Sequence, residues 1–241
     1  MKEAAMNHAT GLARWFGLAL AAAALTLMVA CSALKPKPVQ PPAFFALDAA
    51  PSAAPALVAA ALRNAANGPA AAPTLVVNPP QAGAGFDSQR IIYLRQAHQL
   101  GYFAHSEWID TPARMLAPLI VAALDRSGNF RAVLATSGAA TGDLRLDTEI
   151  VRLQHEFGAT PSLVRLTLRA TLSDTATRQV LDQVEFDHRA ESPSEDAYGG
   201  VIAANDATRA MLQALAAFCS QTAERWQARE TNAGKRAVGR R

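Results

Sequence analysis

Three consecutive segments in the second half of the chain alternate between apolar and polar residues. They are Leu144–Ile150, Val164–Leu172 and Val180–His188, and short turns at 157–162 and 174–178 separate them. A period of two is typical of β-strands that bury one face and leave the other in water. We therefore expect a three-stranded antiparallel meander.

Two further segments carry apolar residues at helical spacing. The first begins at Thr111-Pro112, where a capping residue precedes a proline that suits the first helical position, and it ends at Gly128. Pro118 lies inside this pattern, so we expect a kink or a later start of the helix. The second helix is expected over Glu195–Thr222, with an apolar stripe that includes Cys219.

Five shorter segments rich in apolar residues are interpreted as additional strands, the fourth of them following a turn near Gly101. They are Phe44–Asp48, Thr74–Val77, Ile91–Leu94, His98–His105 and Phe130–Leu134. The order of strands, helix, strands and helix predicts an α+β fold: an antiparallel sheet with a C-terminal meander and two helices packed on it. We expect residues 44–223 to form this single domain. A weak helix over Ala54–Asn67, inside the low-complexity stretch Ala49–Pro73, stays undecided.

The first thirty residues have the pattern of an export signal. Lys2 and Arg14 precede an uncharged stretch, Phe16–Ala30, which is shorter than the roughly 20 residues of a membrane-spanning helix. Translation from Met1 or from Met6 would leave this pattern intact. We therefore expect residues 1–30 to be a signal peptide.

A cysteine follows this stretch directly. The sequence Leu27-Met28-Val29-Ala30-Cys31 resembles the lipobox of bacterial lipoproteins, which implies cleavage before Cys31 and attachment of two or three acyl chains to it. An ordinary secretory signal with an incidental cysteine and an uncleaved anchor are the alternatives. Ser32, in place of the aspartate typical of inner-membrane retention, favours the outer membrane, facing the periplasm.

The mature chain is expected to have unstructured ends. Residues 31–43 contain Pro36, Pro38, Pro41 and Pro42, and prolines this dense favour an extended tether between the lipidated cysteine and the domain. Residues 224–241 hold six arginines and lysines against two glutamates, a basic tail that we expect to be disordered.

Composition excludes several classes of protein. An apolar fraction of 50% with 18% charged residues predicts a folded core, and a net charge of +3 is too small to indicate nucleic-acid binding. The two cysteines, Cys31 and Cys219, exclude a disulfide scaffold and zinc modules with four or two cysteines.

No arrangement of residues indicates catalysis, a metal or a cofactor. The mature histidines show no pair at the helical spacing of zinc proteases; they are His98, His105, His155 and His188. No G-x-S-x-G elbow or P-loop occurs, and Gly83-Ala84-Gly85 is interpreted as a loop. Cys219 is expected to be a buried small apolar residue, and Asp147 and Glu149 are expected to lie on a solvated strand face.

Aromatic residues cluster at Tyr102, Phe103 and Trp108. Two interpretations stay open: a corner of the core, or a docking patch for a partner or for lipid.

Several short segments resemble a known family when they are taken in order. They are Phe44–Leu47 soon after the lipobox cysteine, Ile91-Ile92-Tyr93 leading to Tyr102, Glu107–Pro112 opening a helix with Met115-Leu116, and the alanine-rich Ala197–Cys219. In this order, over about Phe44–Gln221, they resemble the ABC-type transport auxiliary lipoprotein family, the PqiC-like group. The insertion Ala49–Pro73 and the basic tail depart from the family pattern.

The resemblance implies a non-enzymatic, outer-membrane-anchored component of an intermembrane lipid transport system. Its expected partners are a mammalian-cell-entry (MCE) domain protein that spans the periplasm, which it would dock, and the ABC permease and ATPase subunits. A homo-oligomer is plausible, because some members form rings. The alternative is an outer-membrane assembly or β-barrel-associated lipoprotein, and a periplasmic hydrolase is a third possibility.

Overall fold

The computed structural model describes residues 41–48, 72–136 and 141–238. The described strands and helices belong to the second of two compact units, residues 42–241. The signal peptide, Cys31 and the possible helix at 54–67 lie outside the described residues. The strands are β1 (Ala43–Phe45), β2 (Thr74–Val77), β3 (Gln81–Ala82), β4 (Arg90–Gln96), β5 (Gln99–Trp108), β6 (Ala132–Ala135), β7 (Leu144–Glu156), β8 (Leu163–Asp174) and β9 (Val180–Glu191), and the helices are α3 (Pro112–Arg126) and α4 (Ala197–Val238).

Strand β7 is the centre of the sheet. One of its edges pairs with β8, which pairs with β9, and these three strands form the expected antiparallel meander. The other edge pairs in turn with β2 at Leu144–Leu146, with β3 at Glu149–Ile150 and with β4 at His155–Glu156. Two branches therefore leave β7, β2–β6 at its start and β4–β5–β1 at its end. Twelve strand residues separate the two branch points by about 40 Å.

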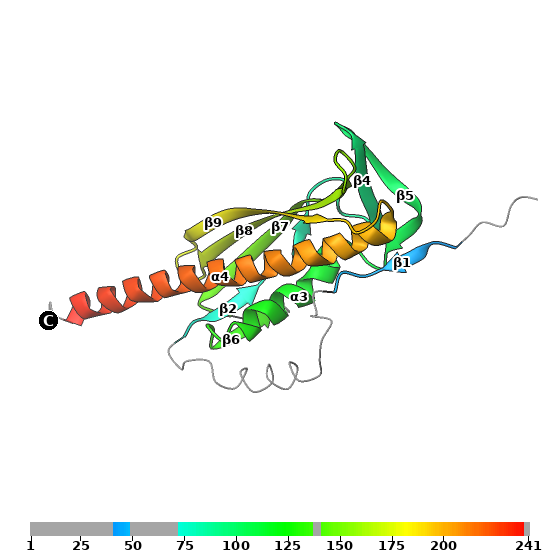
Figure 1. Ribbon diagram of the computed structural model, residues 1–241. Helices are drawn as coiled ribbons and strands as arrows, with labels where there is room; N and C mark the ends of the chain where they lie inside the picture. Colours follow the sequence, from blue (N-terminus) through cyan, green and yellow to red (C-terminus); the bar gives the residue numbers. More distant parts are fainter. Residues whose placement is uncertain (1–40, 49–71, 137–140, 239–241) are drawn as a thin grey trace, which may run out of the picture. The chain divides into compact units, whose positions relative to one another are not determined.

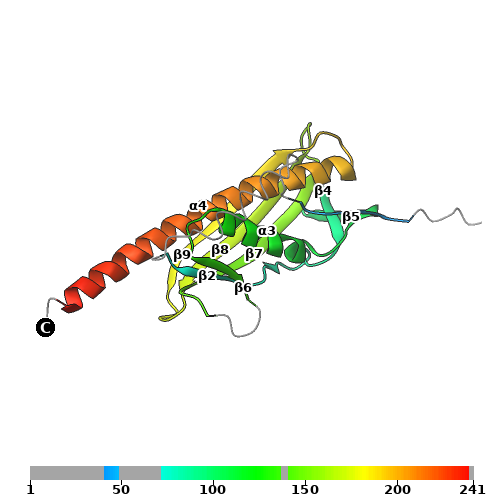
Figure 2. The same cartoon turned by 90° about the horizontal axis from the view of Figure 1, so that it is seen from below.

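Both helices lie on one face of this sheet (Figures 1 and 2). Helix α4 packs along β8 and β9, and α3 packs between α4 and β6. Fully buried leucine, isoleucine and methionine side chains fill the space between helices and sheet: Leu116, Ile120, Leu124, Leu146, Ile150, Leu166, Leu168, Met211 and Leu215. Cys219 belongs to this core, and burial raises the pKa of its thiol to about 12. The prediction that Cys219 is a buried small apolar residue is confirmed.

The opposite face of the meander is polar, as the alternation predicts. Arg169 pairs with Glu149 of β7 (2.8 Å) and with Glu185 of β9 (3.0 Å). Arg165 pairs with Asp187 (2.7 Å), and this guanidinium lowers the pKa of Asp187 to about 2. These carboxylates are thus members of cross-strand ion pairs on a solvated face.

The sheet as a whole is mixed, so the expectation of an antiparallel sheet is only partly right. Strands β2, β3 and β4 run parallel to β7, and β2 also runs parallel to β6. Parallel pairs need a connection that crosses a face of the sheet. For the β2–β6 pair, α3 is part of that connection and directly precedes β6 in the chain. Strand β3 is the one element that the pattern does not predict.

The turn between β4 and β5 lies at Ala97-His98, where His98 has a φ of 68°, and not near Gly101. Gly101 sits inside β5 opposite Tyr93. A Cβ at this position would lie 2.7 Å from Tyr93 Cζ, so glycine allows the Tyr93 ring to lie across the strand. The glycine marks a close approach and not a chain reversal.

Helix α3 starts at Pro112 and continues through Pro118, so the later start does not occur. Helix α4 continues to Val238, well beyond the expected end at Thr222. Residues 224–238, expected to be a disordered tail, are therefore helical. No proline interrupts this segment, and Trp226 packs against the core and donates from its indole Nε1 to Asp174 (2.8 Å). Among the described residues, no helix combines the length and hydrophobicity needed to cross a bilayer.

We predict that Trp226→Phe raises the pKa of Asp174. Burial alone would raise that pKa, but hydrogen bonds from the Trp226 indole and from two turn amides outweigh burial and hold it below its ordinary value. A carboxylate with a lowered folded-state pKa stabilises the fold above its unfolded-state pKa, and this stabilisation is lost as the pH falls through the folded-state value. The variant should therefore lose more unfolding free energy at about pH 7 than at about pH 3.

Carboxyl NMR titration and urea unfolding at both pH values measure these effects. Asp182 is the internal control, since its lowered pKa depends on Arg225 and should not change. An unchanged pKa of Asp174 would contradict the role given to the indole.

Candidate functional site

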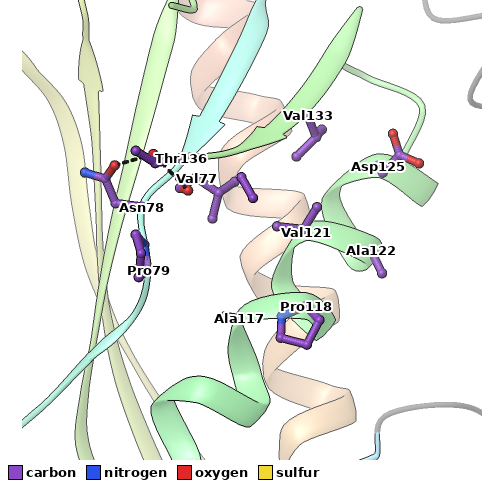
Figure 3. Close-up of a pocket in the computed structure, with 11 residues that line it drawn as sticks. Val77, Asn78, Pro79, Ala117, Pro118, Val121, Ala122, Asp125, Val133 and Thr136 are labelled. Atoms are coloured by element: carbon purple, nitrogen blue, oxygen red, sulfur yellow. Dashed lines mark hydrogen bonds between the residues drawn. The ribbon is translucent and has the colours of Figure 1, made fainter. Parts of the chain in front are cut away.

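An apolar groove of about 560 Å³ lies between α3 and the β2–β6 pair (Figure 3). On the helix side, Ala117, Val121 and Asp125 follow one another at intervals of four residues and so share a line along α3. The strand side of the groove consists of Val77, Asn78, Pro79, Val133, Ala135 and Thr136. Small alanine side chains on both walls leave this space open. Its size and apolar lining are those of a pocket that holds an apolar ligand or side chain.

The polar groups at the strand end of the groove are satisfied by one another. The Thr136 hydroxyl donates to Asn78 Oδ1 (2.6 Å), and Asn78 Nδ2 donates to Asp147 Oδ1 (2.6 Å). The Thr136 amide donates to the Val77 carbonyl (3.0 Å), which fixes the strand end. These bonds hold the rim rigid, and Asp125 is the one ionisable side chain among the residues that line the groove.

Strand β6 beside the groove pairs with β2 and, within the described residues, with no second strand. Leu134 of β6 is 37% exposed. An unpaired strand edge offers backbone amides and carbonyls to an added strand. The groove and this edge together form a surface suited to an extended or apolar segment of another molecule.

A serine, a histidine and a glutamate meet at the end of β7. His155 Nε2 lies 2.7 Å from Ser162 Oγ, and the Ser162 amide donates to Glu195 Oε1 (2.9 Å). Hydrogen bonds from Ser162 hold the pKa of Glu195 below its ordinary value. The pKa of His155 is also lowered, and there the main cause is burial.

This cluster lacks the geometry of a hydrolase triad. Ser162 is fully buried, so no substrate reaches its hydroxyl. His155 Nδ1 has no hydrogen-bond partner, and a Cβ on Gly200 would lie 2.6 Å from it, so no acid orients the ring from that side. The network instead connects the end of β7, the loop before β8 and the segment before α4. The described residues also contain no group of three or more histidine, cysteine or acidic residues placed to hold a metal ion.

The structure separates the three aromatic residues of the predicted docking patch. Trp108 is 3% exposed and belongs to the core, so its inclusion in a surface patch is wrong. Phe103 is half-buried against Tyr93, with ring centroids 4.9 Å apart. Tyr102 is 51% exposed, because successive residues of a strand point to opposite faces. Of the three, Tyr102 alone is available to another molecule, and Cys31 lies outside the described residues.

The residues of the groove were not predicted from the sequence. The buried stripe of α3, which contains Met115, Leu116 and Ile120, indicates only that the helix packs on the sheet. The line of residues from Ala117 to Asp125 could have been recognised in the sequence, because its apolar members recur at helical spacing outside the buried stripe of α3. The tertiary arrangement that places β6 beside this line of residues cannot be inferred from local sequence patterns.

An open apolar groove beside an unpaired strand edge, on a mixed α+β domain, is the architecture of a protein that binds or docks. Comparison of the sequence with known families then identifies the chain as a member of the ABC-type transport auxiliary lipoprotein component family, whose sequence model matches residues 56–221. This family consists of lipoproteins that assist a transport system, and it is not an enzyme family. The resemblance noted from the sequence is confirmed.

Solved structures share the fold. Protein XCC0632 from Xanthomonas campestris, of the DUF330 family, superimposes with a TM-score of 0.64 at 21% identity, covering 76% of this chain and 97% of that one. An uncharacterised protein gives a TM-score of 0.57 at 11% identity, covering 75% of this chain and 99% of that one. At these identities the likeness concerns the fold alone. A comparison with curated proteins finds no match.

We predict that Trp108→Ala destabilises the protein by about 3–5 kcal/mol, the cost of emptying the site of a large buried aromatic ring. The adjacent Ile109→Ala is a matched control, since Ile109 is 61% exposed and its truncation should change the unfolding free energy by less than about 0.5 kcal/mol. Urea unfolding monitored by circular dichroism measures both. Equal stabilities of the two variants would contradict the burial of Trp108.

Proposed function

We propose that this protein is a non-catalytic component of an ABC transport system that moves lipids between membranes. In this proposal Cys31 anchors it in the outer membrane, and the folded domain docks an MCE-domain protein in the periplasm. Family membership supports the role in transport, and the lipobox at Leu27–Cys31 supports the anchor.

The observation that carries the docking role is the groove between α3 and β6. Its 560 Å³ and its alanine and valine walls suit an apolar segment of a partner, and the free edge of β6 can add backbone hydrogen bonds. The groove belongs to the β2–β6 branch, whereas the tether joins the domain at β1, on the other branch. Such an arrangement lets one end of the domain stay near a membrane while the other meets a partner.

The anchor makes weak docking sufficient. Confinement at one membrane raises the effective concentration of the domain toward any partner that reaches that membrane. A contact of modest affinity is then occupied most of the time. Lipidation of Cys31 would therefore compensate for the weak binding expected of a mostly apolar surface.

Affinity purification from membranes tests the proposal. The full-length protein is compared with Cys31→Ala, and co-purifying chains are identified by mass spectrometry. Recovery of an MCE-domain protein with ABC subunits, reduced in the variant, is the expected result. Recovery of a β-barrel without them would replace the proposal by the assembly-factor alternative, and recovery of no partner at all would contradict the docking role.

We predict that Ala122→Lys lowers recovery of the MCE-domain protein about tenfold, since it places a charge in the apolar groove. Ala210→Lys is the matched control, an exposed alanine of α4 outside the groove. Both variants should keep the wild-type thermal midpoint, because alanine and lysine are both good helix formers. Equal loss of the partner in the two variants would remove the groove from the docking surface.

A further inference from the structure

Exposed large apolar side chains gather at one part of the second unit. Of the seven that the structure describes, Leu100 and Tyr102 lie on β5, Phe44 on β1 and Ile109 directly after β5, each more than half exposed. A fifth, Tyr198, lies beside Phe45 of β1, with ring centroids 6.2 Å apart. We call the β4–β5 hairpin together with β1 the tether branch. Such a concentration marks a contact surface.

Two arginines accompany these side chains. The Arg90 guanidinium lies 4.1 Å from the centre of the Tyr102 ring. Arg95 lies over Phe157 (4.7 Å) and Tyr93 (5.3 Å). Neither arginine forms an ion pair with a carboxylate of the described residues, in contrast to Arg165 and Arg169 on the meander. The tether branch therefore offers two unpaired cations beside exposed aromatic and aliphatic groups.

Much of the hairpin has no neighbouring strand. Strand β7 pairs with β4 at Tyr93 and Leu94, and β1 pairs with β5 at Ser106–Trp108. The stretch Arg95–His105 is free on its outer sides, and Figure 1 shows the hairpin standing away from the helices. Leu100 and Tyr102 are each about half exposed, and Arg90 lies over one face of the Tyr102 ring.

The length of the chain limits how far this surface can lie from Cys31. Eleven residues lie between Cys31 and Ala43, and this length of extended chain spans at most about 40 Å. Strand β1 runs parallel to β5, and eight residues, about 26 Å, separate Ser106 beside β1 from His98 at the tip of the hairpin. The tip therefore lies within reach of the membrane that holds the anchor.

We propose that the tether branch rests on the anionic phospholipid surface of the membrane in which Cys31 is anchored, with Arg90 and Arg95 against phosphate groups and Leu100 and Tyr102 in the headgroup layer. Tyrosine, arginine and exposed leucine are the side chains that favour this layer. A lipid anchor and an apolar patch that carries two arginines are two signals that together give stable membrane contact, although Glu107 opposite Arg90 reduces the net charge of the patch. This inference rests on the proposed lipidation of Cys31.

The test places an environment-sensitive label at the hairpin tip of the full-length lipidated protein. The label is attached at Ala97→Cys and, as a matched control, at Ala176→Cys; both alanines are exposed and lie in turns that connect two antiparallel strands. Ala176 lies just after Asp174, which pairs with the start of β7, about 40 Å from the hairpin. Cys219 is fully buried, so labelling with NBD-maleimide is confined to the introduced thiol. The proteins are reconstituted into phosphatidylethanolamine vesicles with phosphatidylglycerol, with or without brominated acyl chains.

We predict that brominated lipid quenches the label at position 97 at least about two-fold more than the label at 176. Leu100→Ser with Tyr102→Ser should abolish the difference, whereas Val180→Ser, an equally exposed apolar residue on β9, should preserve it. Arg90→Gln with Arg95→Gln should remove the dependence on phosphatidylglycerol. Circular dichroism confirms that each variant is folded.

Two negative outcomes have different meanings. If the intact protein does not float with the vesicles, the anchor is absent and the proposed function falls together with this inference. If it floats but position 97 is quenched no more than position 176, this inference alone is overturned. A blue shift at position 97 that rises with protein concentration, without quenching, would assign the surface to a second copy of the chain and would also overturn it.

Discussion

The pairing of β7 along both of its edges is the constraint on which the rest of the domain depends. One edge binds a single long partner, β8, and the other binds three short strands in succession, each parallel to β7. Short parallel strands gain few hydrogen bonds, so β2 and β3 depend on the edge of β7, whereas β4 is held mainly by its antiparallel pairing with β5. The buried side chains of β7, among them Leu146 and Ile150, then join this sheet to α3 and α4.

The same arrangement separates two surfaces of different chemistry. The β2–β6 branch, with α3, forms a groove lined by small apolar side chains and one carboxylate. The β4–β5–β1 branch carries exposed leucine and tyrosine beside unpaired arginines. In the proposed function the tether joins the domain at β1, on the branch that carries the second surface, and the first surface is left for a partner.

The sequence predicted the elements better than their arrangement. Alternation over 144–188 identified the meander because each strand there buries one face, and Pro112 and Gly128 bounded α3 by simple backbone rules. The parallel pairs were not predictable, because β2 meets β7 some seventy residues later in the chain. The turn was wrongly expected near Gly101, because this glycine makes room for the Tyr93 ring of the neighbouring strand and does not reverse the chain. Trp108 and Tyr102 looked alike in sequence, and burial separates them. The basic residues after Thr222 suggested disorder, yet Trp226 holds that segment to Asp174.

Photocrosslinking in intact cells tests the central claim most directly, namely that one branch meets the partner and the other does not. A benzophenone amino acid is placed at Ala122 in the groove and, in a separate strain, at Ala97 in the hairpin turn. The account predicts an adduct with an MCE-domain protein from position 122 and none from position 97. Capture of that protein from position 97 alone, or from neither position, would contradict it.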